Sequence, residues 1–171
     1  DKSILLGRNL YCSICYKTSF SDPLALLEKL HAPDQPHCYF EKATDDFSIA
    51  CGQYLAHQEF SGPNRFLLAK DWSTELLNFV ERAGDAPIAG SGPTIFLTAA
   101  FESEISDSCR SSLCVFLPKW QVVQQGGEHF IILNIKVTPT SIAVDMQKNL
   151  SFQLHAMMGL RKEKLSDQLP P

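Results

Sequence analysis

The stretch LCVFLPKWQVVQQGGEHFIILNIKV, residues 113–137, is the strongest indication of the fold class of this chain. It holds two runs rich in β-branched and aromatic residues, Leu113 to Gln125 and His129 to Val137, joined around Gly126-Gly127. Adjacent glycines readily supply the positive φ angles that a tight hairpin turn requires. The stretch therefore predicts an antiparallel β-hairpin.

Three further segments have the composition of strands. Cys38 to Glu41 and Phe47 to Cys51 flank the polar residues 43–46, a pattern that predicts a second hairpin. Ile4 to Tyr16 mixes apolar and small residues and is expected to be extended. The apolar run Ile95 to Phe101 lies between a Gly/Ser/Pro stretch and an acidic loop, and it predicts a central strand buried on both faces.

A helix is predicted between the strand segments Ile4 to Tyr16 and Cys38 to Glu41. Ser21 or Asp22 can cap it, and Pro23 suits its first position because the proline needs no hydrogen-bond partner there. Three leucines then recur at helical spacing and are expected to pack on the sheet: Leu24, Leu27 and Leu30.

Two later segments also have helical patterns. A polar bend that contains residues 62–64 is expected after Gly52. The residues from Trp72 to Val80 then keep nearly helical spacing, with a cap at Asp71 or Ser73 and an end at Gly84. Ile142 to Arg161 predicts a third helix.

Together these segments predict a single α+β domain over residues 1–161, with a largely antiparallel sheet and helices packed outside it. A chain of 171 residues can bury a core of its own without disulfides or a metal. Residues 162–171 end in Pro170-Pro171 and are expected to form a linker or tail.

Composition excludes two classes of partner. The net charge is −4 and 20% of the residues are charged, so no basic field attracts nucleic acid or an anionic membrane surface. The apolar runs are far shorter than the roughly 20 residues that a membrane-spanning helix needs. A cytoplasmic location is expected.

The six cysteines are too sparse for a disulfide scaffold. Cys12-Ser13-Ile14-Cys15 has a CxxC spacing, and His37, Cys38 and Cys51 are the residues that would complete a zinc site. A second closely spaced pair is missing, so reduced thiols are the favoured interpretation.

No nucleophile, phosphate loop or zinc motif is complete. Gly90-Ser91-Gly92 lacks the Lys-Ser/Thr of a phosphate loop and indicates a turn. The five histidines lack the HExxH spacing of a zinc motif. The acidic stretch Glu102 to Asp107 indicates a solvated loop, with cation binding as the alternative. Lys119 and Trp120 form either a recognition pair or part of a hairpin that covers the core.

Read in order, five segments resemble the N-terminal half of chorismate-utilising enzymes, which have the anthranilate synthase component I-like fold. Residues 22–27 (DPLALL) are similar to the family's early helix start, and residues 37–42 (HCYFEK) resemble its extended Phe-Tyr-Phe-Glu strand. Residues 47–52 (FSIACG) resemble the paired strand that usually ends in Gly-x-Gly, although Tyr54 replaces the second glycine here.

The remaining two segments lie in the second half of the chain. Residues 92–101 occupy the place of a strand that ends in Gly-Gly-Phe-Ala-Phe-Asp, but residues 97–102 read LTAAFE and lack both glycines and the aspartate. Residues 113–120 (LCVFLPKW), followed by Gln125-Gly126-Gly127, are similar to the family's aromatic-Leu-Pro-Arg-Trp strand and hairpin.

Within this family the chain most resembles isochorismate synthases, of menaquinone or siderophore pathways. Anthranilate synthases place Leu-Leu-Glu-Ser on an N-terminal strand for feedback by tryptophan, whereas Leu26-Leu27-Glu28-Lys29 lies in a predicted helix. Salicylate and aminodeoxychorismate synthases remain enzymatic alternatives. A non-catalytic interaction or structural domain, from a truncated or diverged gene, is the alternative of a different class.

The resemblance implies a reaction that adds water at C2 of chorismate and expels the C4 hydroxyl. It also implies Mg²⁺ at the substrate, a lysine base and a glutamate that assists departure of the hydroxyl. The family's residues for these roles lie in the C-terminal half, so no catalytic, cofactor-binding or metal residue is assigned in this chain. The isolated chain is expected to be inactive.

The implied partner is the C-terminal chorismate-binding half of the same protein. An N-terminal half without it should expose apolar surface, for which Ile95 to Phe101 and Phe130 to Ile135 are the candidates. Self-association of the isolated chain is then expected.

Overall fold

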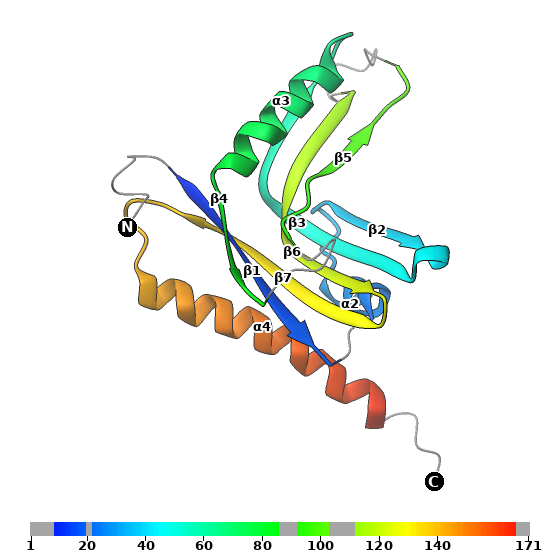
Figure 1. The fold of residues 1–171 in the computed structure, drawn as a ribbon, viewed down its shortest axis with the longest axis vertical. Coiled ribbons are helices and arrows are strands. Elements are labelled where there is room, and N and C mark those ends of the chain that lie inside the picture. The colour runs from blue at the N-terminus through cyan, green and yellow to red at the C-terminus, as the bar shows by residue number, and fades with distance from the viewer. Residues whose placement is uncertain (1–8, 20–21, 86–91, 103–111, 167–171) are drawn as a thin grey trace.

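The computed structural model describes residues 9–19, 22–85, 92–102 and 112–166, with side chains described as far as residue 158 (Figure 1). Its strands form a seven-stranded sheet in the order β2-β3-β6-β7-β1-β4, and β5 pairs with β6 off this path. The strands are β1 Leu10–Thr18, β2 His37–Lys42, β3 Phe47–Phe60, β4 Val80–Gly84, β5 Phe96–Ala99, β6 Leu113–Gln125 and β7 Glu128–Val137.

The hairpin predicted around Gly126-Gly127 is present. Strands β6 and β7 are antiparallel from Trp120 opposite Leu133 to Gln125 opposite Glu128, and both Gly126 and Gly127 have positive φ. The pairing of β1 with β4 is parallel, and all the other pairings are antiparallel. The predicted α+β class with a largely antiparallel sheet is confirmed.

The second hairpin is confirmed, and its second strand is longer than expected. Strands β2 and β3 pair antiparallel around the short 3₁₀ helix η1, Ala43–Asp45. Instead of giving way to a polar bend after Gly52, β3 continues to Phe60. The extension follows from the pairing with β6, which continues as far as Phe60. The polar side chains of residues 57–59 do not prevent this pairing, because they remain exposed to solvent.

Helix α2, Pro23–Leu30, begins as predicted. The Asp22 carboxylate accepts a hydrogen bond from the Ala25 backbone N–H at 3.1 Å, and proline occupies the first turn. Leu26 and Leu27 are buried, whereas Leu24 is 45% exposed, so the face that packs on the sheet is rotated from the one expected. Helix α4, Ala143–Ser166, occupies the predicted C-terminal position, but it continues to Ser166, into the segment 162–171 that was expected to be a linker or tail.

The predicted bounds of the middle helix are wrong. Helix α3 runs from Arg65 to Asn78, and Val80 already belongs to strand β4. Gly84 ends that strand with a φ of 98°, where a Cβ would lie 2.0 Å from the Cys15 carbonyl oxygen. Close contact between β4 and β1 therefore requires glycine at position 84, and the glycine does not mark the end of a helix.

The prediction of a central strand at Ile95 to Phe101 is wrong. Strand β5 covers only Phe96–Ala99, pairs with β6 alone among the strands that the structure describes, and leaves Leu97 46% exposed. Phe101 lies beyond the strand and is fully exposed. An apolar run can therefore mark an edge strand, because periodicity alone does not report how many neighbours a strand has.

The core lies on both faces of the sheet. Trp120 and Val122 of β6 pack with Ile131 and Leu133 against α2 and α4. Leu113 and Val115 of the same strand pack instead against α3. Because side chains alternate along a strand, α3 covers the face opposite to α2 and α4.

The expectation that Phe130 to Ile135 forms exposed surface is wrong for most of its length. Phe130, Ile131, Ile132 and Leu133 are at most 2% exposed. Ile131 and Leu133 face the helices, whereas Phe130 and Ile132 pack with Cys15, Ile49 and Val123 on the other face. In the described ranges, no helix is long and apolar enough to cross a membrane.

Candidate functional site

The sheet divides at the segment Phe116-Leu117-Pro118-Lys119-Trp120. Strand β6 pairs with β7 from Trp120 onward, and with β5 up to Phe116, so it changes partner between these residues. Figure 1 shows the two arms that result, one with α3 and β5 and the other with β1, β7 and β4 beside α4. Strand β3 follows β6 along both arms, with a bulge between Tyr54 and Ala56.

A glycine and a tryptophan pack tightly at this division. A Cβ added to Gly52 would lie 2.6 Å from Cζ2 of Trp120, which is closer than packed atoms allow. Trp120 is 6% exposed and belongs to the core beneath α2 and α4. Of the suggested pair, Trp120 is thus a core residue, and Lys119 is exposed.

On the face of the sheet opposite Trp120, two buried amide side chains form hydrogen bonds at the point where β6 no longer pairs with β7. The Asn134 side chain donates to the Pro118 carbonyl at 2.8 Å and to Gln121 Oε1 at 3.2 Å. Gln121 also accepts from the Thr94 backbone N–H at 3.0 Å and donates to the Gly92 carbonyl at 3.3 Å. Both side chains are at most 3% exposed, so this network holds the division together away from water.

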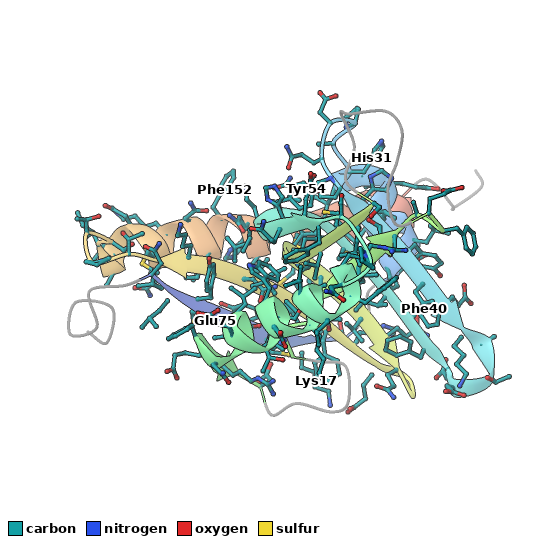
Figure 2. The ribbon with its side chains drawn as sticks, turned by 90° about the horizontal axis from the view of Figure 1, so that it is seen from above. Lys17, His31, Phe40, Tyr54, Glu75 and Phe152 are labelled. Atoms are coloured by element: carbon teal, nitrogen blue, oxygen red, sulfur yellow. The ribbon has the colours of Figure 1, made fainter. Side chains whose placement is uncertain are left out.

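Aromatic rings gather at the bulge and on the arm that carries β5. Tyr54 stacks on His57 with centroids 4.4 Å apart and meets Phe116 edge-on at 5.2 Å, and Phe116 stacks on Phe96 at 5.7 Å. Figure 2 shows Tyr54 on the same side of the molecule as His31, at the end of α2, and Phe152 of α4, with Lys17 on the other side.

The Tyr54 hydroxyl stays protonated at neutral pH. Its oxygen lies 3.6 Å from Cys114 Sγ. Burial raises the pKa of Tyr54 to about 12, and the contact with Cys114 and the charge of Glu59 act in the same direction. A phenol with a pKa so far above neutrality is a poor general base.

An open pocket of about 320 Å³ lies between the start of α2 and the β2–β3 hairpin. Its three carboxylates each serve a structural contact. Asp22 caps α2, Glu41 accepts from the Tyr39 hydroxyl at 2.8 Å, and Asp46 accepts from the Gly127 backbone N–H at 2.9 Å. Carboxylates repel an anionic ligand, so the pocket does not suit an anionic substrate.

The residues weighed for a zinc site do not converge. On strand β1, Cys12 and Cys15 are three positions apart, and an odd spacing places their side chains on opposite faces. In the described ranges, no group of three or more His, Cys, Asp or Glu side chains could hold a metal ion. Most of the acidic stretch, residues 103–107, and Gly90-Ser91 lie outside these ranges.

The comparison with known families supplies the identity that this geometry lacks. The family model for "Chorismate binding enzyme" matches residues 5–170, which is nearly the whole chain. This chain is a member of the chorismate binding enzyme family. No curated protein and no solved structure matches it.

In this member of the chorismate binding enzyme family, the residues that carried the resemblance have packing roles. Trp120 fills the core, Pro118 stands where β6 leaves β7, and Gly52 makes room for the indole. Sequence reasoning missed Gln121 and Asn134. Their only signal was a polar side chain inside an apolar strand, which points to an internal hydrogen bond.

Proposed function

We propose that this chain is the N-terminal structural part of an isochorismate synthase. The observation that carries the choice within the family is the placement of Leu26-Leu27-Glu28-Lys29. These residues lie in helix α2, with Leu26 and Leu27 packed in the core, and do not form the strand on which anthranilate synthases carry Leu-Leu-Glu-Ser. A tryptophan feedback site of that kind has no counterpart there.

The proposed role is to support a C-terminal half that binds chorismate. Catalysis needs an acid, a base and a cation held together within hydrogen-bond reach of the substrate. The described residues do not fit Mg²⁺, because the pocket carboxylates are engaged and no other acidic cluster is present among them. We therefore assign Mg²⁺ and all catalytic groups to the C-terminal half.

An apolar end of the molecule is the proposed contact with that half. Arg65, 7% exposed, donates from Nη2 to the Ala100 and Phe101 carbonyls at 3.4 and 3.3 Å. Its guanidinium also lies 4.7 Å from the centre of the Phe66 ring. Arg65 thus brings two exposed phenylalanines, Phe66 and Phe101, to the same end as the exposed Leu67. Exposed apolar clusters of this kind mark interaction surfaces.

One observation favours the alternative of a non-catalytic domain. Residues 97–102 lack the two glycines and the aspartate that the resemblance leads one to expect at the end of this strand. If the C-terminal half has diverged in the same way, the domain serves only as a partner surface. Salicylate and aminodeoxychorismate synthases are the enzymatic alternatives, and they differ from isochorismate synthase in product. We propose a cytoplasmic location for the protein under each of these alternatives.

The test is the product that the full-length protein forms from chorismate with Mg²⁺. Isochorismate, separated by chromatography and consumed by an isochorismate-specific enzyme, is the expected product with or without glutamine or ammonia. Salicylate, anthranilate or aminodeoxychorismate would reassign the enzyme. Absence of any product from the folded full-length protein would favour the non-catalytic alternative.

A further inference from the structure

Two cysteines face each other across the β2–β3 hairpin. Cys38 is directly opposite Cys51 in the antiparallel register, and both are free thiols. The bond from the Gln53 N–H to the Pro36 carbonyl, 2.8 Å, sets the alternation of the ladder. Hydrogen-bonded and non-hydrogen-bonded pairs alternate along an antiparallel ladder, so Cys38 and Cys51, two positions further along each strand, are again a hydrogen-bonded pair. Their side chains lie on one face of the sheet.

This geometry is close to that of a disulfide. The Cα atoms of a hydrogen-bonded antiparallel pair are about 5.5 Å apart, within the roughly 4.4–6.8 Å found for disulfides. The Cβ atoms of cross-strand neighbours are about 4.5–5.5 Å apart, whereas a disulfide needs about 3.5–4.5 Å. Closing the bond requires a small approach of the strands, which β2 can make because, among the described strands, it pairs with β3 alone at the edge of the sheet.

The two sulfurs differ in access. Cys38 is half-buried, whereas Cys51 is 0% exposed. Burial raises the pKa of both thiols. For Cys51 the charge of Cys38 raises the pKa further, and a hydrogen bond with the Cys38 backbone lowers it. An oxidant from solution therefore reaches Cys38 first. The Cys51 sulfur is buried and does not contact reagents in solution directly.

We propose that Cys38 and Cys51 are a reversible oxidation site that closes to a cross-strand disulfide in the presence of a peroxide. Hydrogen peroxide converts the Cys38 thiolate to a sulfenic acid and releases hydroxide. The Cys51 sulfur then attacks the Cys38 sulfur, so that an S–S bond forms and the S–O bond breaks, and the hydroxyl leaves as water with the Cys51 proton. Two thiols and one peroxide thus give one disulfide and two waters.

The bond should also be easy to reduce. A disulfide that forces its strands together stores strain, and strained disulfides are the more reducible and regulatory ones. A dithiol supplies the two electrons that restore both thiols. The pair Cys12 and Cys15 offers an internal comparison, because their opposite faces on β1 prevent the same closure.

Tryptic mapping of the folded chain tests the proposal. The reduced protein should give six titratable thiols in denaturant. After treatment with a few equivalents of hydrogen peroxide, trapping of remaining thiols and digestion without reductant, peptides 30–42 and 43–65 each hold one of the two cysteines. They are expected as one linked species, about 2 Da lighter than their sum, that dithiothreitol separates. Peptide 9–17, which holds Cys12 and Cys15, should keep both thiols.

Two variants act as controls. Cys12→Ser should leave the linked species unchanged. Cys38→Ser should abolish it, and Cys51 should then remain a thiol because it is buried. Recovery of peptides 30–42 and 43–65 as separate species, with Cys38 oxidised to the sulfinic acid, would overturn the proposal. Linkage of Cys51 mainly to any other cysteine would do the same, and both outcomes are read on the unmutated chain.

Discussion

The indole of Trp120 lies against Gly52, so closely that a Cβ at position 52 would be 2.6 Å from Cζ2. The two residues face each other across β3 and β6 at the point where the sheet divides. Trp120 cannot move away freely, because Leu133 and the leucines of α2 pack around it. The missing side chain at position 52 is thus a requirement of the tryptophan.

Gly52→Ala should destabilise the chain by about 1–3 kcal/mol, the usual cost of overpacking a core. The free energy of unfolding from urea titration measures it. Gly92→Ala is the matched control, because a Cβ there meets only the Arg82 side chain at 3.6 Å and should change stability by less than about 0.5 kcal/mol. Equal stability of the two variants would contradict the packing assigned to Trp120.

Asn134→Asp should cost about 1–3 kcal/mol, although the side chain keeps its size. A carboxylate cannot donate, so it leaves the Pro118 carbonyl and Gln121 Oε1 without the bonds that Asn134 gives them. Asn149→Asp on the exposed face of α4 is the control and should be nearly neutral. Urea titration compares the two, and a nearly neutral Asn134→Asp would refute the role of the network.

Much of the fold could be predicted from local patterns. Gly126-Gly127 between two β-rich runs located the β6–β7 hairpin, and the cap at Asp22 before Pro23 located the start of α2. These signals work because they depend on neighbours in the sequence: a turn needs positive φ, and a helix start needs an acceptor.

Features set by distant contacts could not be predicted in the same way. The run at Ile95 to Phe101 has the composition of a central strand, but within the described part of the chain its strand pairs only with β6. Likewise, β3 extends beyond Gly52 because β6 continues to pair with it, although the residues themselves look like a bend. The family resemblance located the motif that ends at Trp120, whereas the hydrogen bond from Asn134 to the Pro118 carbonyl of that motif became apparent only in the folded sheet.

Tyrosine ionisation should be delayed in the folded chain. A hydrogen bond to Glu41, burial and nearby negative charge raise the pKa of Tyr39 from 10.0 to about 12. Between pH 10 and pH 12 the folded chain keeps a proton that the unfolded chain has lost, so stability is complete below pH 10 and falls as pH rises to 12. Tyrosinate absorbance during an alkaline titration measures the delay.

Glu41→Gln tests the cause of that delay. It removes the carboxylate that accepts from the Tyr39 hydroxyl, so Tyr39 should ionise at lower pH than in the unmutated chain. Glu28→Gln removes an exposed charge on α2 and should leave the titration unchanged. Identical titrations of the Glu41→Gln variant and the unmutated chain would mean that this hydrogen bond does not control the tyrosine.

The apolar end at Phe66, Leu67 and Phe101 should drive self-association of the isolated chain. Leu67 is 57% exposed in the first turn of α3, and Leu67→Lys should weaken association by placing a charge on that surface. Thr74→Lys adds the same charge to an exposed position later in α3 and is the control. Sedimentation at several concentrations measures the effect. A compact monomer at all concentrations would argue against a surface that needs a partner.

We infer that this chain supports catalysis without performing it, and the rate of isochorismate formation from chorismate and Mg²⁺ tests this claim. The isolated chain should give only the background rate, since its described residues hold no assembled acid, base and metal group. Addition of the C-terminal half should raise the rate above background. Magnesium-dependent turnover by the isolated chain would contradict the claim.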